Sequence, residues 1–263
     1  MNGFTASVAW LQKLNFVFSQ GSETESRNGL TREVVAHRSM GVDMRFPLMT
    51  VKKRRLSYQF AAAEALWIMN GDDRVESIKN YAPSICRYSD DGVRFFGAYG
   101  PRVADQLAGV IDKLEVDATT RQAVISMWRS NPPETKDVPC TLSVQWMERD
   151  GKLHCIDTMR SSDLWLGWSY DVFSFSMLSA LILLELRDRG VCLGLGNLWL
   201  VAGSSHIYEH NWSRALQCLD NPEDVFYEPL DLAEFKSEIE FREHLQNIAD
   251  RRPLKLNFLK ELV

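Results

Sequence analysis

The chain has 263 residues, 45% hydrophobic and 25% charged, which is enough apolar material for a large core and excludes a disordered composition. The formal net charge is −5, so a groove for nucleic acid is disfavoured, although a few arginines would suffice to bind a small anion. Five cysteines without a CxxC pair indicate neither a disulfide framework nor a metal site, and they favour a reduced, cytoplasmic setting.

The first twenty residues lack the basic start and unbroken apolar core of a signal peptide. The most apolar run, residues 172–184, is interrupted by serines and is too short to cross a bilayer, so we expect a soluble protein without membrane contact. No internal repeat or convincing linker occurs, and a single domain over residues 1–263 is the simplest interpretation.

In the N-terminal half, residues 5–19 have roughly helical apolar spacing and predict a helix. Residues 21–33 are polar and contain glycine, which predicts a loop around Arg27. Residues 34–46 predict a hairpin of two strands that turns near Gly41. A mostly apolar helix is expected over 57–69, and the segment 71–102 is expected to be rich in loops.

In the C-terminal half, residues 123–129 predict a buried strand. Residues 141–149 and 152–160 alternate and flank Asp150–Gly151, the strongest short hairpin signal in the chain. A long buried helix is expected over 170–188, a strand over 195–208 and an amphipathic helix over 231–250. Strands mixed with long helices predict an α/β or α+β layered domain.

Two side chains could supply catalytic chemistry. Cys140 follows Pro139 at the mouth of a strand, where it is either a small buried hydrophobe or a nucleophile whose thiolate is favoured by Arg160 or Arg121. Glu64 lies within an apolar helix, and its carboxylate faces either solvent or a pocket. In a pocket, desolvation would raise its pKa and suit it to proton transfer.

Other polar residues could bind a ligand. Asp171 stands beside much apolar surface, where an unpaired carboxylate is costly to bury. His206 and Tyr208 share one face of an extended segment and could bind a sugar hydroxyl, although a core histidine is equally consistent with the spacing. Three arginines could form a phosphate clamp with Ser161, although each one alone is typical of a surface: Arg27, Arg121 and Arg160.

Seven short motifs occur together in one order: FPLMTVKK (46–53), EALWIMNGD (64–72), GAYG (97–100), PC (139–140), RSSD (160–163), LGWSYD (166–171) and HIY (206–208). In this order and spacing they resemble the thymidylate synthase superfamily. The resemblance covers residues 20 to about 212, and the tail of about 220–263, expected to be helical, diverges from it. It implies a large twisted mixed sheet covered by helices.

The resemblance further implies an obligate homodimer that binds a pyrimidine nucleoside monophosphate beneath 5,10-methylenetetrahydrofolate. Cys140 would attack C6 of the base, and Glu64 would organise the proton-transfer waters, with Asp171 and Tyr99 in the same catalytic group. The substrate-binding residues would be Arg27, Arg160, Ser161, Ser162, His206 and Tyr208, with Arg121 contributed by the other subunit. Asp163, Gly167 and Tyr170 would contact the folate. The family usually has two consecutive arginines where this chain has Arg121–Gln122.

At the position of Asp171 the synthases have an asparagine, whose amide matches O4 and N3 of uracil. Cytosine inverts that pattern, because its N4 donates a hydrogen bond and its N3 accepts one. An aspartate matches this pattern if its carboxyl group and N3 share one proton. Aspartate here resembles the deoxycytidylate hydroxymethylase branch of the superfamily, in which water rather than hydride captures the transferred carbon. Cys86 stands near the position of a synthase tryptophan that packs the folate, which is consistent with water entry.

The favoured activity is therefore 5-hydroxymethylation of dCMP. Three alternatives remain open at this point: the same chemistry on CMP, a thymidylate synthase-like C5-methylation, and a catalytically inactive relative that acts as a binding module. An inactive relative is disfavoured because the chain retains the main residues of the motifs: Cys140, Glu64, Arg160, Asp163, His206 and Tyr208.

Overall fold

The structure, a computed structural model describing residues 3–262, is built on a seven-stranded mixed sheet. The strand order is β1-β2-β7-β6-β5-β4, and β3 pairs with β7 outside this path. Only the β6–β7 pair is parallel. The strands are β1 (Ser22–Ser26), β2 (Gly29–Arg38), β3 (Val42–Asp43), β4 (Ala123–Ser126), β5 (Thr141–Arg149), β6 (Lys152–Asp163) and β7 (Gly194–Tyr208).

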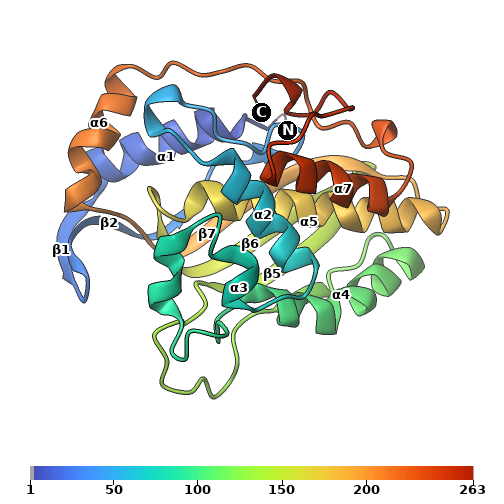
Figure 1. Cartoon of the computed structure of the whole chain (residues 1–263), viewed down its shortest axis with the longest axis horizontal. Helices are drawn as coiled ribbons and strands as arrows, with labels where there is room; N and C mark the ends of the chain where they lie inside the picture. Colours follow the sequence, from blue (N-terminus) through green and yellow to red (C-terminus); the bar gives the residue numbers. More distant parts are fainter. Residues whose placement is uncertain (1–2, 263) are drawn as a thin grey trace.

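Helices cover one face of this sheet in two layers (Figure 1). The helix α5 packs directly on β6 and β7, α1 packs on β2 and β7, and α2 and α7 lie outside α5. The α-helices are α1 (Ala6–Gln20), α2 (Tyr58–Met69), α3 (Val75–Ile78), α4 (Tyr99–Val116), α5 (Trp168–Asp188), α6 (Trp212–Asp220) and α7 (Glu238–Ala249). The expected layered α/β architecture, with a large mixed sheet covered by helices, is confirmed.

In the middle of the sheet, side chains alternate between the two faces. The row Ala123–Trp146–Cys155–Leu198 crosses four strands in register and is fully buried beneath the helices. The neighbouring row Val124–Gln145–Ile156–Trp199 points to the other face and is partly exposed. Val124 is 40% exposed there. The hydrophobic core therefore lies on the helical side, and the opposite face presents half-exposed apolar side chains.

Several predicted elements are confirmed, and local chemistry explains their ends. Ser57 caps α2 by accepting a hydrogen bond from the backbone N–H of Phe60. Asp150 and Gly151 both have positive φ, at 57° and 74°, as a two-residue turn between twisted antiparallel strands requires. That turn sets the register of β5 and β6, and a bulge between Thr141 and Ser143 shifts it by one residue, which brings Cys140 beside Arg160.

Two predictions near the N-terminus are wrong. Residues 21–33 form most of the β1–β2 hairpin rather than a loop, and Arg27 lies at its tip. Every β1 residue is exposed, so no alternation of apolar and polar residues marked it as a strand. Residues 34–46 form no hairpin, because β2 continues to Arg38 and β3 pairs with β7 instead.

The remaining differences concern helices. The segment 71–102 contains α3 and the start of α4, a helix that the sequence analysis did not predict. In the 231–250 segment the α-helix is α7, which begins only at Glu238 after a 3₁₀ turn at Leu232–Glu234. By length and composition α5 could cross a membrane, but 83% of the relevant window is buried inside the protein, as in a core helix.

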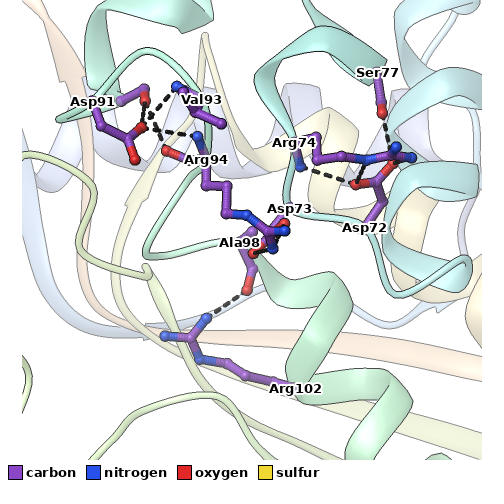
Figure 2. Close-up of polar contacts among 10 residues, drawn as sticks. Asp72, Asp73, Arg74, Ser77, Asp91, Val93, Arg94, Ala98 and Arg102 are labelled. Atoms are coloured by element: carbon purple, nitrogen blue, oxygen red, sulfur yellow. Dashed lines mark hydrogen bonds and ion pairs between the residues drawn. The ribbon is translucent and has the colours of Figure 1, made fainter.

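Carboxylates hold the irregular segment between α2 and α4 in place (Figure 2). Asp72 binds Arg74 and accepts a hydrogen bond from the hydroxyl of Ser77. Arg94 pairs with Asp73, and Asp91 accepts backbone hydrogen bonds at Val93 and Arg94. Further along, Arg102 donates to the carbonyl of Ala98. These contacts fix the start of α4, which carries Tyr99.

Two glycines on α4 offer a matched test of this packing. A Cβ at Gly100 would overlap the backbone of Asp72 and Gly71, whereas nothing lies within 4 Å of a Cβ at Gly109. We expect Gly100→Ala to destabilise the protein by about 1–3 kcal/mol through overpacking. Gly109→Ala should stabilise it by up to about 1 kcal/mol, because alanine favours the helix. Denaturant unfolding of both variants measures the difference, and an unaffected Gly100→Ala would contradict this account.

Candidate active site

A cavity of about 160 Å³ lies between α2, α4, α5 and the segment before β5. Its walls include the predicted residues Glu64, Tyr99, Cys140 and Asp171, together with Trp67, Ile68, Ile85, Phe95, Gly97, Ala98, Asp137, Val138 and Pro139. A larger cavity of about 630 Å³ lies beside Lys152 and Cys192 and contains none of the predicted site residues. The predicted catalytic residues therefore lie together in the smaller cavity.

Cys140 is held against Arg160 by the β5–β6 pairing. The backbone N–H of Arg160 donates to the Cys140 carbonyl at 2.9 Å, and its guanidinium donates to the carbonyls of Pro139 and Val138. One guanidinium nitrogen lies 3.9 Å from Cys140 Sγ. Burial nevertheless raises the pKa of the Cys140 thiol to about 11, and Arg160 offsets this only in part. Arg160 thus acts in the expected direction, toward the thiolate, but burial outweighs it.

Glu64 and Asp171 face the same cavity from α2 and α5. Burial raises the pKa of Glu64 to about 8, and the neighbouring charge of Asp171 contributes to this rise. Burial alone raises the pKa of Asp171 to about 7. The question of whether Glu64 faces solvent or a pocket is thus settled in favour of the pocket. Both carboxyl groups exchange protons near neutral pH, as general acids and bases require.

Gly167, Tyr99 and Tyr170 lie near Asp171, and of these three Tyr99 lines the cavity. A Cβ at Gly167 would lie 3.2 Å from Asp171 Oδ2, so a larger side chain would crowd the carboxyl group. The hydroxyl of Tyr99 accepts a hydrogen bond from the backbone N–H of Thr141 at 3.1 Å. Tyr170 points instead toward α2, where its hydroxyl accepts from the N–H of Ser57.

Asp163 and His206 lie side by side at the paired ends of β6 and β7. Asp163 Oδ1 accepts from two backbone N–H groups, whereas its buried Oδ2 has no hydrogen-bond partner within residues 3–262. Burial lowers the pKa of His206, although the Asp163 charge opposes this. Its Nδ1 lies 3.1 Å from Ser204 Oγ, and its ring meets that of Tyr208 edge-on. The free carboxylate oxygen is suited to accept from an N–H group of a ligand.

The predicted phosphate ligands are only partly brought together. Arg27 lies at the tip of the β1–β2 hairpin, next to Asn28, whose amide donates to the Tyr208 hydroxyl at 3.4 Å. Arg121 precedes β4, at the opposite edge of the sheet from β1, so it lies apart from the other arginines in this subunit. Ser161 and Ser162 pair with β7, and the buried Ser162 hydroxyl has no partner among the described residues.

The sequence analysis missed Asp137 and Thr141. Asp137 lines the cavity and accepts a hydrogen bond from the Gly97 N–H at 2.6 Å, joining the segment before Cys140 to the start of α4. Thr141 binds Tyr99 through its backbone. Proximity to Cys140 in the sequence was their only signal, because neither lies in a recognisable pattern. Within residues 3–262 no cluster of three or more His, Cys, Asp or Glu side chains is placed to hold a metal ion.

Comparisons with known proteins bear on the identity of this chain. The sequence model of the family described as "Thymidylate synthase" matches residues 8–248, a longer stretch than the motifs alone covered. A protein of Bacillus phage SP01 described as "Deoxyuridylate hydroxymethyltransferase" is 27% identical over 231 residues, 79% of this chain. The chain spans 58% of the length of that phage protein.

The raised pKa of Glu64 predicts how stability depends on pH. Between about pH 4.5 and 8 the unfolded state ionises this carboxyl while the folded state must keep it protonated, so the free energy of unfolding falls as pH rises. Glu64→Gln removes this loss. We expect its advantage in unfolding free energy over the wild type to grow from pH 5 to pH 8.5, by up to about 4 kcal/mol. Denaturant unfolding at both pH values measures this.

Glu76→Gln on α3 is the matched control, because its side chain is 77% exposed. We expect it to show no comparable growth with pH. An equal growth in both variants would contradict the burial of Glu64.

Proposed function

Because the chain belongs to the thymidylate synthase family, we propose that it transfers a one-carbon unit from 5,10-methylenetetrahydrofolate to C5 of a cytidine monophosphate, with dCMP preferred to CMP. The product is the 5-hydroxymethyl nucleotide, and the folate leaves as tetrahydrofolate. The observation that carries this proposal is the placement of Asp171 in one cavity with Cys140 and Glu64.

In this mechanism Cys140 Sγ bonds to C6 of the pyrimidine, and C5 becomes nucleophilic. The thiol must lose its proton as it attacks, because its pKa of about 11 keeps it protonated in the free protein. Glu64, with a pKa of about 8, is placed to move protons between pocket water and the nucleotide. C5 then bonds the folate carbon and loses its own proton, and the bond from that carbon to the folate nitrogen breaks, so that tetrahydrofolate leaves and an exocyclic methylene remains. Water adds to this methylene, and the Cys140–C6 bond breaks to release the product.

Asp171 supports cytosine recognition. A carboxyl group that shares one proton with the base accepts from N4–H and completes a second hydrogen bond at N3. The ionised form meets the lone pairs of O4 if uracil binds, and a bidentate match is worth about 1–3 kcal/mol. Asp163 Oδ2, buried without a partner among residues 3–262, supplies an acceptor for the pterin of the folate.

A second candidate is the same reaction on dUMP. With a pKa of about 7, Asp171 is protonated in about half of the molecules at neutral pH. Protonated Asp171 can donate to O4 of uracil and accept from N3–H, as an asparagine does. The phage protein that this chain resembles is described as acting on deoxyuridylate. Reaction on CMP and C5-methylation are further variants of the same mechanism.

We also propose that the enzyme is a homodimer in the cytoplasm of the producing or infected host cell. The face of the sheet opposite the helices carries the half-exposed row that includes Val124, Ile156 and Trp199. A second copy on this face would bury that row. It would also bring its Arg121 to the phosphate in the site of the first copy, because within one subunit Arg121 lies apart from the other predicted phosphate ligands.

The decisive experiment offers dCMP, CMP and dUMP separately with methylenetetrahydrofolate and identifies the products by mass. We expect 5-hydroxymethyl-dCMP as the main product, without the rise in dihydrofolate absorbance that a methylation produces. If 5-hydroxymethyl-dUMP is the main product instead, the second candidate is established. A methylated product, or no product with any nucleotide, would refute hydroxymethylation.

Asp171→Asn tests base recognition. The asparagine amide matches the hydrogen-bonding pattern of uracil. We therefore expect the ratio of kcat/KM for dCMP to kcat/KM for dUMP to fall by about 10–100-fold, which corresponds to the discrimination of a bidentate pair. Ser176→Ala on the same helix is the control, because Ser176 donates to the Val172 carbonyl away from the cavity. An unchanged ratio in Asp171→Asn would remove Asp171 from base selection.

A further inference from the structure

One carboxyl group in the wall of the active-site cavity has no part in the mechanism above. Asp137 lines this cavity together with Cys140 and with both carboxyl groups of that mechanism. Its Oδ2 accepts a hydrogen bond from the backbone N–H of Gly97 at 2.6 Å. Its Oδ1 accepts none from the described part of the chain, yet it is not sealed off from solvent. Asp137 therefore has one fixed oxygen and one oxygen that is free to bind water.

The segment that carries Asp137 is anchored on two sides. The carboxylate of Asp90 binds the Thr135 hydroxyl and accepts a hydrogen bond from the backbone N–H of Lys136 at 3.1 Å. The backbone N–H of Asp137 donates to Thr135 Oγ1 at 3.1 Å. On the other side, a Cβ at Gly97 would lie 2.9 Å from Asp137 Cγ and 2.6 Å from its carbonyl oxygen, so a glycine is needed there. The carboxyl group is thus held in place before a ligand binds, as a catalytic group requires.

A buried arginine on α4 supplies positive charge near this carboxyl group. Arg102 is 5% exposed, and its Nε and Nη2 have no hydrogen-bond partner within residues 3–262. Its guanidinium lies 5.5 Å from the centre of the Phe96 ring, and Arg129 approaches the same ring at 5.3 Å. Burial raises the pKa of Asp137, whereas the Gly97 N–H and the charge of Arg102 oppose this rise. Arg102 therefore supports the charged form of Asp137 without occupying its free oxygen.

The other ionisable groups that line the cavity are engaged in other steps. Glu64, with a pKa of about 8, holds a proton at neutral pH and so acts first as a donor. Asp171 binds the base in the proposed mechanism, and burial keeps the Tyr99 hydroxyl protonated by raising its pKa well above the ordinary value. Cys140 is bonded to C6 once the methylene has formed. The remaining carboxyl group of the cavity wall is Asp137, three residues before the sulfur that holds the ring.

We propose that Asp137 is the general base for the water molecule that captures the transferred carbon. Its Oδ1 binds this water and takes a proton from it while the water oxygen bonds the exocyclic methylene. The electron pair of the methylene double bond moves into the ring and re-forms the C5–C6 double bond, as the Cys140–C6 bond breaks and its pair leaves on the sulfur. The Cys140 thiolate then receives the proton held by Asp137 through pocket water, so both groups return to their starting state.

This inference rests on the proposed function, because only a hydroxymethylation contains a water-capture step. The competing role for Asp137 is structural, as an anchor for Gly97. Asparagine separates the two roles, since its amide oxygen can still accept from the Gly97 N–H but an amide cannot take a proton from water. Asp137→Asn should therefore keep the shape of the cavity and lose only the base.

The first experiment follows a single turnover of Asp137→Asn with methylenetetrahydrofolate and dCMP that carries tritium at C5, or dUMP labelled in the same way if dUMP is the substrate. Tritium release reports the steps up to loss of the C5 proton, and the hydroxymethyl nucleotide reports water capture. We expect tritium release within about threefold of the wild-type rate and product formation about 100-fold slower, as loss of a general base predicts. Mass spectrometry of the denatured protein should show the Cys140 adduct with its methylene accumulating in between.

Asp90→Asn is the matched control, because Asp90 anchors the same segment from an exposed position outside the cavity. We expect it to keep the wild-type ratio of the two rates. Equal slowing of both rates in Asp137→Asn, or no slowing, would overturn the inference and leave the proposed function intact. A wild-type protein that forms no hydroxymethyl nucleotide would refute the proposed function, and the water step with it.

The second experiment adds 2-mercaptoethanol during steady-state turnover. Its thiolate competes with water for the exocyclic methylene and needs no base, because it carries no proton to remove. We expect the ratio of thioether nucleotide to hydroxymethyl nucleotide to rise by about 100-fold in Asp137→Asn and to stay at the wild-type value in Asp90→Asn. The same ratio in Asp137→Asn and the wild type would refute a role for Asp137 in water capture.

Discussion

A carboxyl group buried in the first turn of α5 is the constraint on which the chemistry of this protein depends. The helix N-terminus favours the ionised form of Asp171, whereas burial disfavours it more strongly and raises its pKa to about 7. The group is thus poised between donor and acceptor at neutral pH. Gly167 leaves room for it, and Glu64 across the cavity keeps a proton to even higher pH. An asparagine in the place of Asp171, with its amide held in one orientation, would offer only one hydrogen-bonding pattern.

Cys140, the proposed nucleophile, is positioned by sheet geometry rather than by its own electrostatics. The Asp150–Gly151 turn and a bulge between Thr141 and Ser143 together set the register of β5 and β6 near Cys140. Arg160 then binds three successive carbonyls of the segment that ends at Cys140. Burial keeps the thiol protonated, so reactivity must come with the nucleotide and its proton acceptors. Asp137 and Tyr99 connect this segment to α4, whose start is fixed by the carboxylate contacts of residues 72–98.

The two faces of the sheet differ in what they carry. The helical face contains the core and the cavity, and the open face carries a half-exposed apolar row with Arg121 at its edge. A site that lacks one of its expected arginines within the subunit is consistent with assembly through this open face. The same division explains why the N-terminal hairpin escaped prediction. Both faces of β1 meet solvent, so hydrophobic alternation, the main sequence signal for strands, is missing there.

The sequence by itself determined the family, the β5–β6 hairpin and the long core helix, because these depend on linked short motifs, local turn chemistry and apolar periodicity. It also supplied the candidates for the site. Only the tertiary structure decided which carboxyls share a cavity, since Glu64 and Asp171 lie on different helices far apart in the chain. It also decided their proton affinities, because desolvation depends on what packs around a group and not on its neighbours in sequence. Asp157 and Lys13 show this most clearly, because nothing near either residue in the sequence indicates that both are buried or that each shifts the pKa of the other.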